Sequence, residues 1–552
     1  MSSGEKEEKR ISRRDFVRGA AVGAAGVAAA SVLTGCAQEA PASTPEVIKE
    51  TVEVPVEVIK EVEVKPWLPE KWDYEADVVA VGFGAAGSAV AIEAADAGAD
   101  VLLLEKMPEG LDGGNFGVCG GLLLSPATSA TWVQELTFGK VDAEIVRLSD
   151  ETEKNLLEWL ESLGLTVDLI TQYPGITFGW VAEKGTGLFA AFKEQVKQRG
   201  VNVLYETSGK ELIQDPVTGE ILGVKAESKG QILNIKARKG VVLTTGGYES
   251  NSEMLNDLNH PGVYIASVGS PGNTGDGLKM AIKAGARLSH IGMDVEWWSF
   301  AYRLPSQLYK TGITGTFPSN SYIFANKAGK RFMDEKTSLV HTKTPLQALH
   351  FEGELTLPPP PVSEYPNIPF FAVFDDKVIK SGPLSTLGTT GWNDVYKIYE
   401  WSADNSVELN NGWIVKADTV EELAAKMTAV DEFGRSVGVD SAGLVDTINK
   451  FNQDCASGID SQFKRASNAL APLDTPPYYA IEMCLSAIYT IGGLKYNANA
   501  QVLNYDNKPI PRLYMVGMVG SCGIVLPFGG IVESFTFGRV AAKNAVSLEP
   551  WG

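Results

Sequence analysis

Ala76-Asp77-Val78-Val79-Ala80-Val81, followed at once by Gly82-Phe83-Gly84-Ala85-Ala86-Gly87, is the stretch that decides the fold of this 552-residue chain. Its first half is a short apolar run suited to a buried parallel strand. Its second half has the G-x-G-x-x-G spacing, and a helical pattern continues to about Ala97. A second apolar run, Val101–Leu104, ends in Glu105. This strand–helix–strand context predicts a Rossmann-like dinucleotide-binding unit in an α/β protein.

Each residue type in this unit has a physical role in a dinucleotide-binding site. Gly82 permits a tight turn, and Gly84 lets the backbone approach a pyrophosphate. Gly87 allows close packing of helix and strand, while the helix start at Ala85 and Ala86 offers unpaired N–H groups. We expect Glu105 to accept hydrogen bonds from ribose hydroxyls. The alternative is a glycine-rich turn without a ligand.

Further motifs distinguish between classes of dinucleotide protein. They are Glu105-Lys106 with Gly113-Gly114-Asn115 and Gly120-Gly121, then Val241-Val242-Leu243-Thr244-Thr245-Gly246-Gly247, then Thr274-Gly275-Asp276-Gly277, then Leu513-Tyr514-Met515-Val516-Gly517, and finally Gly529-Gly530-Ile531-Val532-Glu533. In this order they resemble the fumarate reductase and succinate dehydrogenase flavoprotein family. The match is closest to its flavocytochrome-like and ketosteroid-dehydrogenase-like members and covers about residues 74–546.

The resemblance implies FAD held by an N-terminal and a C-terminal segment of a two-dinucleotide-binding-type domain, with an α+β capping domain inserted between them. It implies the remaining cofactor-binding residues: Lys106, Gly113, Gly114, Asn115, Gly121, Thr245, Gly246, Gly247, Asp276, Gly517, Gly529, Gly530, Ile531 and Val532. Thr245, Gly246 and Gly247 would lie near the adenine, and Asp276 near the flavin ring. Met518 and Phe116 depart from the family pattern, which usually has a glutamate and a small hydroxyl residue at these positions.

Fumarate reduction in this family uses arginines and histidines, and their positions fall here at about Trp297, Pro318, Tyr489 and Pro527. Recognition of a dicarboxylate in a dry pocket without fixed positive charge is costly. Fumarate and succinate are therefore improbable substrates. Aromatic replacements favour a flat or apolar molecule, although these rings can equally pack the interior of the cap.

A proton is needed if a polarised C=C bond is reduced, and a phenol can donate one at neutral pH. We expect Tyr489 or Tyr322 to be this donor. Trp297, Arg303 and Gly530 are candidate substrate-binding residues, with Gly530 matching the family glycine whose N–H binds a carbonyl. A solvated surface arginine is the alternative reading of Arg303.

The N-terminal residues are typical of an export signal. Ser12-Arg13-Arg14-Asp15-Phe16 is typical of a twin-arginine signal, and Leu33-Thr34-Gly35-Cys36 is typical of a lipobox with Cys36 lipidated. We expect residues 1–36 to be this signal and 37–72 a tether, with an edge strand as its alternative. Residues 73–290 and 416–552 would form the FAD-binding domain, and 291–415 the cap. This predicts a lipid-anchored protein on the outer face of the bacterial cytoplasmic membrane or in the periplasm.

Charge and cysteine spacing limit the partners. The formal net charge of −20 makes nucleic acid an unsuitable partner. It suits a basic redox partner, or simply solubility. The cysteines lack CxxC spacing, so neither haem nor a metal is predicted. Because no electron-input module is visible, we expect a separate membrane or cytochrome electron donor.

Together the sequence features predict an exported FAD-dependent oxidoreductase acting on CH–CH groups, by hydride transfer from flavin N5 to a small organic acceptor. Alternatives are a dehydrogenase running in reverse and an electron-carrying lipoprotein.

Overall fold

The computed structural model describes residues 67–125, 141–153, 155–173, 176–181, 186–291, 295–304, 311–336, 352–354, 362–388, 390–520 and 530–552. Chain contacts separate residues 1–64 from the unit Lys65–Gly552, and every described residue lies in the second. The predicted signal with Cys36, the tether up to residue 66, Pro527 and Gly529 lie outside the described residues.

A parallel sheet forms around the strand that carries the glycine motif. Its order is β6-β2-β1-β9-β23, with β22 antiparallel at one edge and the antiparallel pair β7-β8 attached to β9. The bounds are β1 (Tyr74–Val81), β2 (Val101–Leu104), β6 (Asn202–Leu204), β7 (Thr207–Gln214), β8 (Ile221–Ser228), β9 (Gln231–Leu243), β22 (Gln501–Leu503) and β23 (Pro509–Met515). The strand pairing confirms the predicted α/β class. It also brings the end of the chain beside its beginning, because β9 pairs with both β1 and β23.

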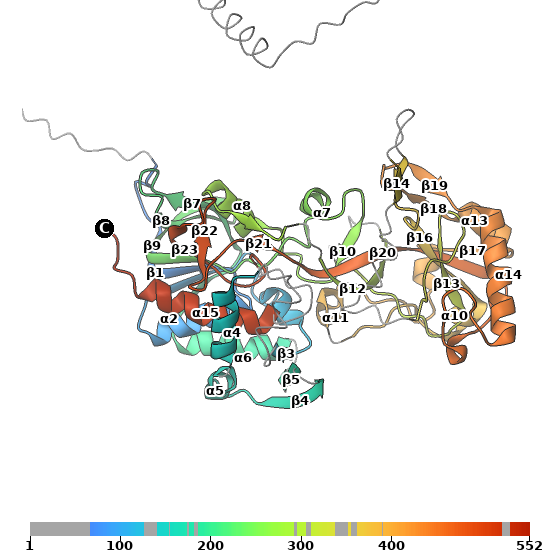
Figure 1. Cartoon of the computed structure of the whole chain (residues 1–552), viewed down its shortest axis with the longest axis horizontal. Helices are drawn as coiled ribbons and strands as arrows, with labels where there is room; N and C mark the ends of the chain where they lie inside the picture. Colours follow the sequence, from blue (N-terminus) through green and yellow to red (C-terminus); the bar gives the residue numbers. More distant parts are fainter. Residues whose placement is uncertain are drawn as a thin grey trace, which may run out of the picture. The chain divides into compact units, whose positions relative to one another are not determined.

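Two helices from opposite ends of the described chain pack together against this sheet. They are α2 (Ala85–Asp96) and α15 (Gly530–Val546), which lie side by side in Figure 1. A Cβ placed on Gly538 would lie 2.7 Å from the Cβ of Ala89. Small residues at this crossing therefore allow the close approach, and both helix N-termini reach the same region of the fold.

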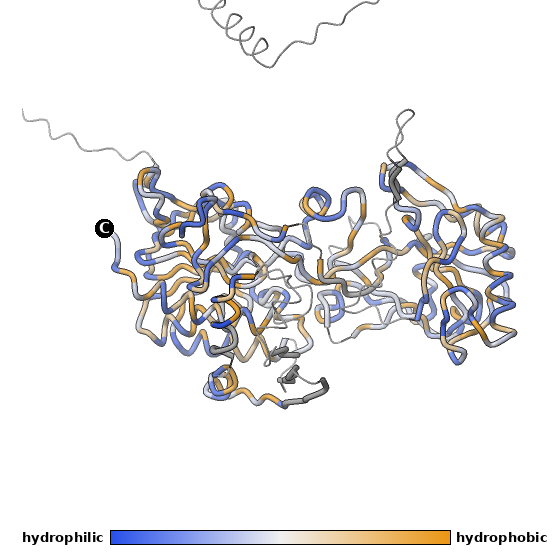
Figure 2. The backbone as a smooth tube through the Cα atoms, viewed as in Figure 1, coloured by the Kyte–Doolittle hydropathy of each residue, from blue (hydrophilic) through white to orange (hydrophobic). Residues whose placement is uncertain are grey.

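A second sheet is organised around the long strand β20 (Tyr478–Thr490), which pairs with four others. Its strands are β10 (Ile265–Ser267), β12 (Val295–Tyr302), β13 (Tyr322–Asn326), β16 (Phe370–Asp375) and β17 (Ile414–Ala417). One face buries Ile323, Val373 and Ala480 against the helices α13 (Val420–Lys426) and α14 (Ser441–Ser457). Hydrophilic and hydrophobic stretches alternate along α14 in Figure 2, as expected for a helix with one buried face.

This packing crosses the predicted boundary between residues 415 and 416. Leu423, Leu444 and Phe451 all belong to the same buried cluster as the cap strands. The cap core therefore continues to the start of β20. The helix α13 begins after Thr419, whose side chain accepts a hydrogen bond from the N–H of Glu422 at 3.2 Å.

The remaining described elements are helices and the strands of smaller, separate sheets. They are η1 (Gly114–Val118), β3 (Leu122–Ser125), α4 (Ala143–Glu153), α5 (Leu156–Ser162), β4 (Val167–Tyr173), β5 (Ile176–Val181), α6 (Thr186–Gln198), α7 (Ser252–Leu258), α8 (Asp276–Lys283), β11 (Leu288–Ser289), β14 (Glu352–Glu354), β15 (Val362–Glu364), α10 (Asp376–Ser381), α11 (Trp392–Tyr396), α12 (Ser406–Asn410), β18 (Thr428–Val430), β19 (Ser436–Gly438), η2 (Ser467–Ala469) and β21 (Gly493–Leu494). Among the described residues, no helix combines the length and apolar character needed to span a bilayer.

Candidate active site

The glycine turn between β1 and α2 is sterically dictated. Gly82 has a φ of +114°, and a Cβ there would lie 2.5 Å from the carbonyl oxygen of Thr244. A Cβ on Gly87 would lie 2.0 Å from the carbonyl oxygen of Gly82. The first hydrogen bond of α2 runs from Ser88 N–H to Gly84 C=O at 3.0 Å. The preceding N–H groups thus have no intrahelical acceptor and can bind phosphate oxygens.

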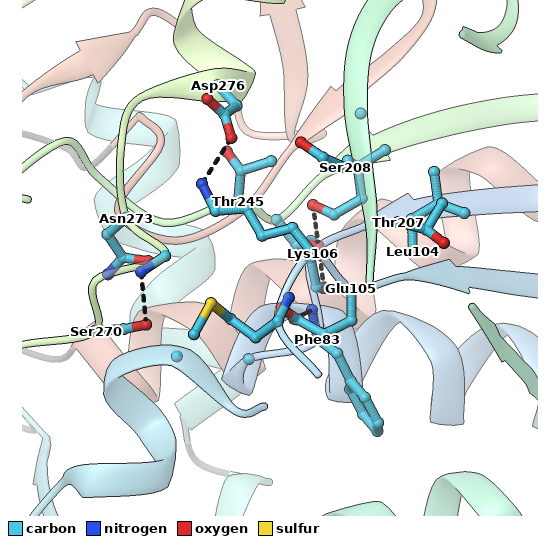
Figure 3. A pocket seen from close by; sticks show the side chains of 18 residues that line it. Phe83, Leu104, Glu105, Lys106, Thr207, Ser208, Thr245, Ser270, Asn273 and Asp276 are labelled. Atoms are coloured by element: carbon cyan, nitrogen blue, oxygen red, sulfur yellow. Dashed lines mark hydrogen bonds and ion pairs between the residues drawn. The ribbon is translucent and has the colours of Figure 1, made fainter. Parts of the chain in front are cut away.

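A cavity that is partly open to solvent lies directly beside this turn. We call it the Glu105 cavity, and Figure 3 shows its side chains. The Glu105 carboxylate accepts hydrogen bonds from Phe83 N–H at 2.9 Å and from Met107 N–H at 2.7 Å. Burial raises the pKa of Glu105, although these two backbone bonds act in the opposite direction. The bonds hold the carboxyl group at the end of β2, where it remains part of the cavity wall.

Lys106 and Asp276 form an ion pair on the wall of the same cavity. The Lys106 ammonium lies 2.8 Å from Asp276 Oδ2 and 2.7 Å from Thr274 Oγ1. The pair joins the end of β2 to the start of α8 (Figure 3). Asp276, expected near the flavin ring, therefore lies at the Glu105 end. It does so because it is the first residue of α8 and follows closely after Gly272 and Asn273, which line this cavity.

A second cavity, also partly open to solvent, shares lining residues with the first. We call it the Tyr489 cavity. Its described lining is Gly84, Ala85, Ala86, Gly113, Gly114, Asn115, Phe116, Cys119, Gly246, Asn273, Ile488, Tyr489, Val516, Gly517, Met518, Gly530, Ile531, Val532 and Ser534. No charged side chain occurs in this described lining. Residues from both ends of the described chain thus meet around one space.

The two cavities together fit an extended dinucleotide. They share Gly84, Gly114 and Asn273, so they are continuous along the start of α2. A Cβ on Gly114 would meet no atom within 4 Å, so any side chain there would extend into open space. The Glu105 cavity supplies a carboxylate for a ribose, and the Tyr489 cavity supplies small and apolar residues for a flat ring. The residues present therefore fit FAD.

The start of α15 forms part of the Tyr489 cavity wall. Gly530 is its first residue, and Gly530, Ile531 and Val532 all line the cavity. The Ser534 hydroxyl donates a hydrogen bond to the Gly530 carbonyl. The N-terminus of a 17-residue helix carries partial positive charge. This position can therefore stabilise negative charge on a bound ring.

A buried carboxyl group lies behind the Tyr489 cavity. Glu249 is 1% exposed, and its Oε1 accepts hydrogen bonds from Asn273 at 2.6 Å and Asn115 at 2.9 Å. Both asparagines line the cavity, whereas Glu249 itself does not. Burial raises the pKa of Glu249 to about 7, against the lowering effect of the two amides.

Most predicted cofactor residues line the two cavities, with a few in supporting positions. Gly247 is a packing residue, because a Cβ there would lie 2.3 Å from Thr490 Oγ1. Gly121 adopts a φ of +73° in the turn before β3 and is not part of either lining. Met518 and Phe116, the two departures from the family pattern, both line the Tyr489 cavity.

The structure separates the two candidate proton donors. Tyr489 lines the cavity with Gly530 and Asn115. Tyr322 is instead 4% exposed, stacks on Phe317 with ring centroids 4.2 Å apart, and donates its hydroxyl to the Glu335 carbonyl at 3.2 Å. Burial raises the pKa of Tyr322. We therefore correct the expectation for Tyr322: its face of β13 points into the aromatic core of the cap.

Arg303 likewise lies away from both cofactor cavities. Its guanidinium contacts Glu482 Oε1 at 3.0 Å and the Val430 carbonyl at 3.1 Å, and it lies over the ring of Tyr264. These residues, apart from Val430, line a separate cavity beside the cap sheet. Arg303 therefore forms an ion pair in the wall of that separate cavity, and its substrate contact stays a prediction. Trp297 lies on β12 opposite Ala487, and its side chain is outside the described set.

Three further aromatic side chains of the cap lie in its core. Phe300, Tyr302 and Phe324 are each at most 2% exposed. Phe300 packs edge-on against Phe324 and Phe370, with centroids 5.3 and 5.2 Å apart. These rings pack the interior of the cap, as the alternative interpretation of the aromatic residues expects. They do not line the Tyr489 cavity. In the described ranges, no group of three or more His, Cys, Asp or Glu side chains is arranged to hold a metal.

Several contributors were absent from the sequence prediction. Asn273 precedes the Thr274-Gly275-Asp276-Gly277 motif, and Glu249 follows Gly246-Gly247 by two residues. Thr207 and Ser208 enter the Glu105 cavity from β7, which carries no recognisable motif. A charged residue just after a glycine turn at the end of a buried strand is a signal that could have identified Glu249.

The chain is similar to known reductases and a known dehydrogenase. The model of the FAD binding domain family matches residues 77–529. The chain is 26% identical to a digoxin reductase of Eggerthella lenta, over 99% of this chain and 98% of that protein. It is 30% identical to a vinyl phenol reductase of Lactiplantibacillus plantarum, over 80% and 89% of the two chains. The 3-ketosteroid delta1-dehydrogenase from Sterolibacterium denitrificans shares the fold, with a TM-score of 0.65 at 21% identity over 86% of this chain and 99% of that one.

Proposed function

Because the chain belongs to the FAD binding domain family, we propose that it is a flavin reductase of activated C=C bonds in flat, uncharged organic molecules. FAD is the cofactor and the reaction class is oxidoreduction of C=C bonds, as in related reductases. The observation that supports the substrate class is the described wall around the expected position of the flavin ring, the Tyr489 cavity, which has small, apolar and amide side chains and offers no charge to a substrate held against that ring.

Bound FAD supplies the hydride, and the protein residues position the reactants. The start of α2 binds the diphosphate, and Glu105 accepts hydrogen bonds from the adenosine ribose. The start of α15 would favour negative charge on the ring, and the Gly530 N–H would polarise a substrate carbonyl. Tyr489 donates a proton to the carbon that does not receive hydride.

The absence of a cation in the described lining argues against a dicarboxylate. A carboxylate that leaves water requires a charged or multiply hydrogen-bonded partner. Asn115 already donates its amide group to Glu249 and to the Ile488 carbonyl, at 2.9 and 2.8 Å. It therefore has no N–H left to replace an arginine. An aryl-conjugated alkene or an enone makes no such demand, which favours neutral acceptors.

An acceptor panel tests this proposal. The holoprotein is reduced anaerobically with dithionite, and reoxidation of its flavin is followed by absorbance after addition of a vinyl phenol, an enone, acrylate, urocanate or fumarate. We expect a neutral alkene to be the best acceptor. Faster reoxidation by fumarate than by every neutral alkene would contradict the proposal. Reduction of oxidised flavin by a saturated ketone alone would instead favour the dehydrogenase direction, and reoxidation by redox proteins only would favour an electron carrier.

We also propose export by the twin-arginine route, a lipid anchor at Cys36 and a separate membrane or cytochrome electron donor. The paired arginines and the Leu33-Thr34-Gly35-Cys36 sequence support the first two. Mass spectrometry of the mature N-terminal peptide should find an acylated Cys36, and the Cys36→Ala variant should leave the membrane fraction. An unmodified peptide that retains residues 1–35 would contradict the anchor.

A further inference from the structure

Glu249 has an unusual arrangement for a buried acid. Both hydrogen bonds reach one oxygen, Oε1, from Asn273 and Asn115. The other oxygen, Oε2, is buried and has no hydrogen-bond partner among the described residues. A carboxylate normally places donors on both oxygens when it is kept ionised in a protein interior. This geometry leaves Oε2 able to carry a proton.

The surroundings of Glu249 contain no described countercharge. The elements packed against it contribute Asn115 from η1, Asn273 from the loop before α8, and Thr490 from the end of β20. Tyr248 is a titratable neighbour, and burial raises the pKa of Tyr248 to about 12, so it stays neutral. Tyr489 and Cys119 are the titratable side chains of the cavity wall in front. None of the described ion pairs includes Glu249.

The two amides connect this acid to the cofactor site. Asn115 and Asn273 each line the Tyr489 cavity, and Asn273 also lines the Glu105 cavity. A single asparagine side chain therefore separates Glu249 from the cavity in which the flavin ring would lie. In a region of low dielectric, a new negative charge in the cavity and an ionised Glu249 repel each other strongly.

We propose that Glu249 is a charge-compensating group that takes up a proton when the cofactor is reduced. Two electrons and one proton reach the flavin from the electron donor and water, which leaves one added negative charge. Glu249, ionised beforehand, accepts a second proton from solvent, so that two electrons and two protons enter and the site's net charge is unchanged. The burial-raised pKa of about 7 is consistent with such a change near neutral pH.

This inference requires bound FAD and in that respect rests on the proposed function, but its test does not use turnover. Proton uptake is measured with a pH indicator in weakly buffered solution while the flavin is photoreduced. At about pH 8 wild type should take up about one more proton per two electrons than Glu249→Gln, and at about pH 5.5 the two should agree. The midpoint potential of wild type should also fall more steeply with pH between these values.

Glu482 provides a matched control. Burial raises the pKa of Glu482 to about 7, and this side chain pairs with Arg303 in the separate cap cavity. Glu482→Gln should therefore keep the wild-type proton uptake and potential. If Glu249→Gln has normal FAD content but takes up as many protons as wild type at about pH 8, the inference is wrong and the proposed function stands. Wild type that binds no FAD would remove the proposed function itself.

A second readout uses wild type alone and remains decisive if Glu249→Gln does not fold. The reduced-minus-oxidised infrared difference spectrum at about pH 8 should gain a protonated carboxyl band that shifts in heavy water. A spectrum without such a band would overturn the inference.

Discussion

The two ends of the cofactor site differ in charge. The Glu105 cavity has three charged residues in its lining, Glu105, Lys106 and Asp276, and two of them form an ion pair. The described lining of the Tyr489 cavity has none. The first end can recognise polar groups of a nucleotide by fixed charges and hydrogen bonds. The second can desolvate a flat ring and an apolar substrate. We therefore expect affinity for the cofactor and choice of substrate to be determined by different residues.

The largest expected effect comes from the turn that the two cavities share. In Gly87→Val the new Cβ would lie 2.0 Å from the Gly82 carbonyl oxygen, so the turn must move. We expect FAD affinity to fall by roughly 1000-fold or more, measured by equilibrium dialysis and flavin absorbance. Gly438→Ala is the control, because a Cβ there meets only one atom, at 3.9 Å. Retention of a full complement of FAD in Gly87→Val would refute this reading of the turn.

At the uncharged end, Tyr489→Phe removes the proposed proton donor without changing the size of the cavity. We expect kcat to fall by about 100- to 1000-fold with FAD content unchanged. Tyr322→Phe is the matched control: it removes a hydroxyl bonded to the Glu335 carbonyl and should reduce the free energy of unfolding by about 1 kcal/mol with kcat unchanged. If Tyr489→Phe turns over at the wild-type rate, another group donates the proton.

The carboxyl group behind the uncharged end should give a pH-dependent stability. Burial raises the pKa of Glu249 to about 7, so the folded protein favours the protonated form. The resulting stabilisation is fully present below the unfolded-state pKa of about 4.5 and is lost as pH rises through about 7. Between these limits wild type should lose up to about 3 kcal/mol relative to Glu249→Gln. Urea unfolding of both proteins at several pH values measures this difference, and parallel pH profiles would contradict it.

The smallest effect is expected at the charged end. The Lys106–Asp276 pair is about one quarter exposed on each side, so solvent and salt screen it. Lys106→Met and Asp276→Asn should each weaken FAD binding by only three- to tenfold, roughly 1 kcal/mol. Titration at low and high ionic strength checks this, because the difference from wild type should shrink with salt. A loss as large as that of Gly87→Val would mean that the pair is essential to the cavity.

The parts of the site that were predictable are those where backbone geometry demands one residue type. Gly82 and Gly87 have no room for a Cβ, and Glu105 follows a buried strand at the expected distance from the glycine motif. The local sequence pattern was therefore sufficient to predict these three residues. The predictions of Tyr322 as a proton donor and Arg303 as a substrate-binding residue rest on residue chemistry alone. The orientation of these two side chains depends on which face of the cap sheet each one occupies, and that is set by pairing between strands far apart in sequence.

Two further features depend on tertiary packing. The cap core includes α13 and α14 because their apolar faces cover one side of β13, β16 and β20, and no composition change marks that boundary. Glu249 is recognisable as a site only from tertiary contacts, because Asn115 and Asn273, 134 and 24 residues away in sequence, both donate to the same carboxylate oxygen.

The most direct test of the account is the orientation of FAD in a crystal structure of the holoprotein. We predict the adenosine ribose within hydrogen-bonding distance of the Glu105 carboxylate, the diphosphate at the start of α2, and the isoalloxazine ring beside Tyr489 and Gly530. An isoalloxazine ring in the Glu105 cavity, or one outside both cavities, would contradict the division of the site into a charged binding end and an uncharged reacting end.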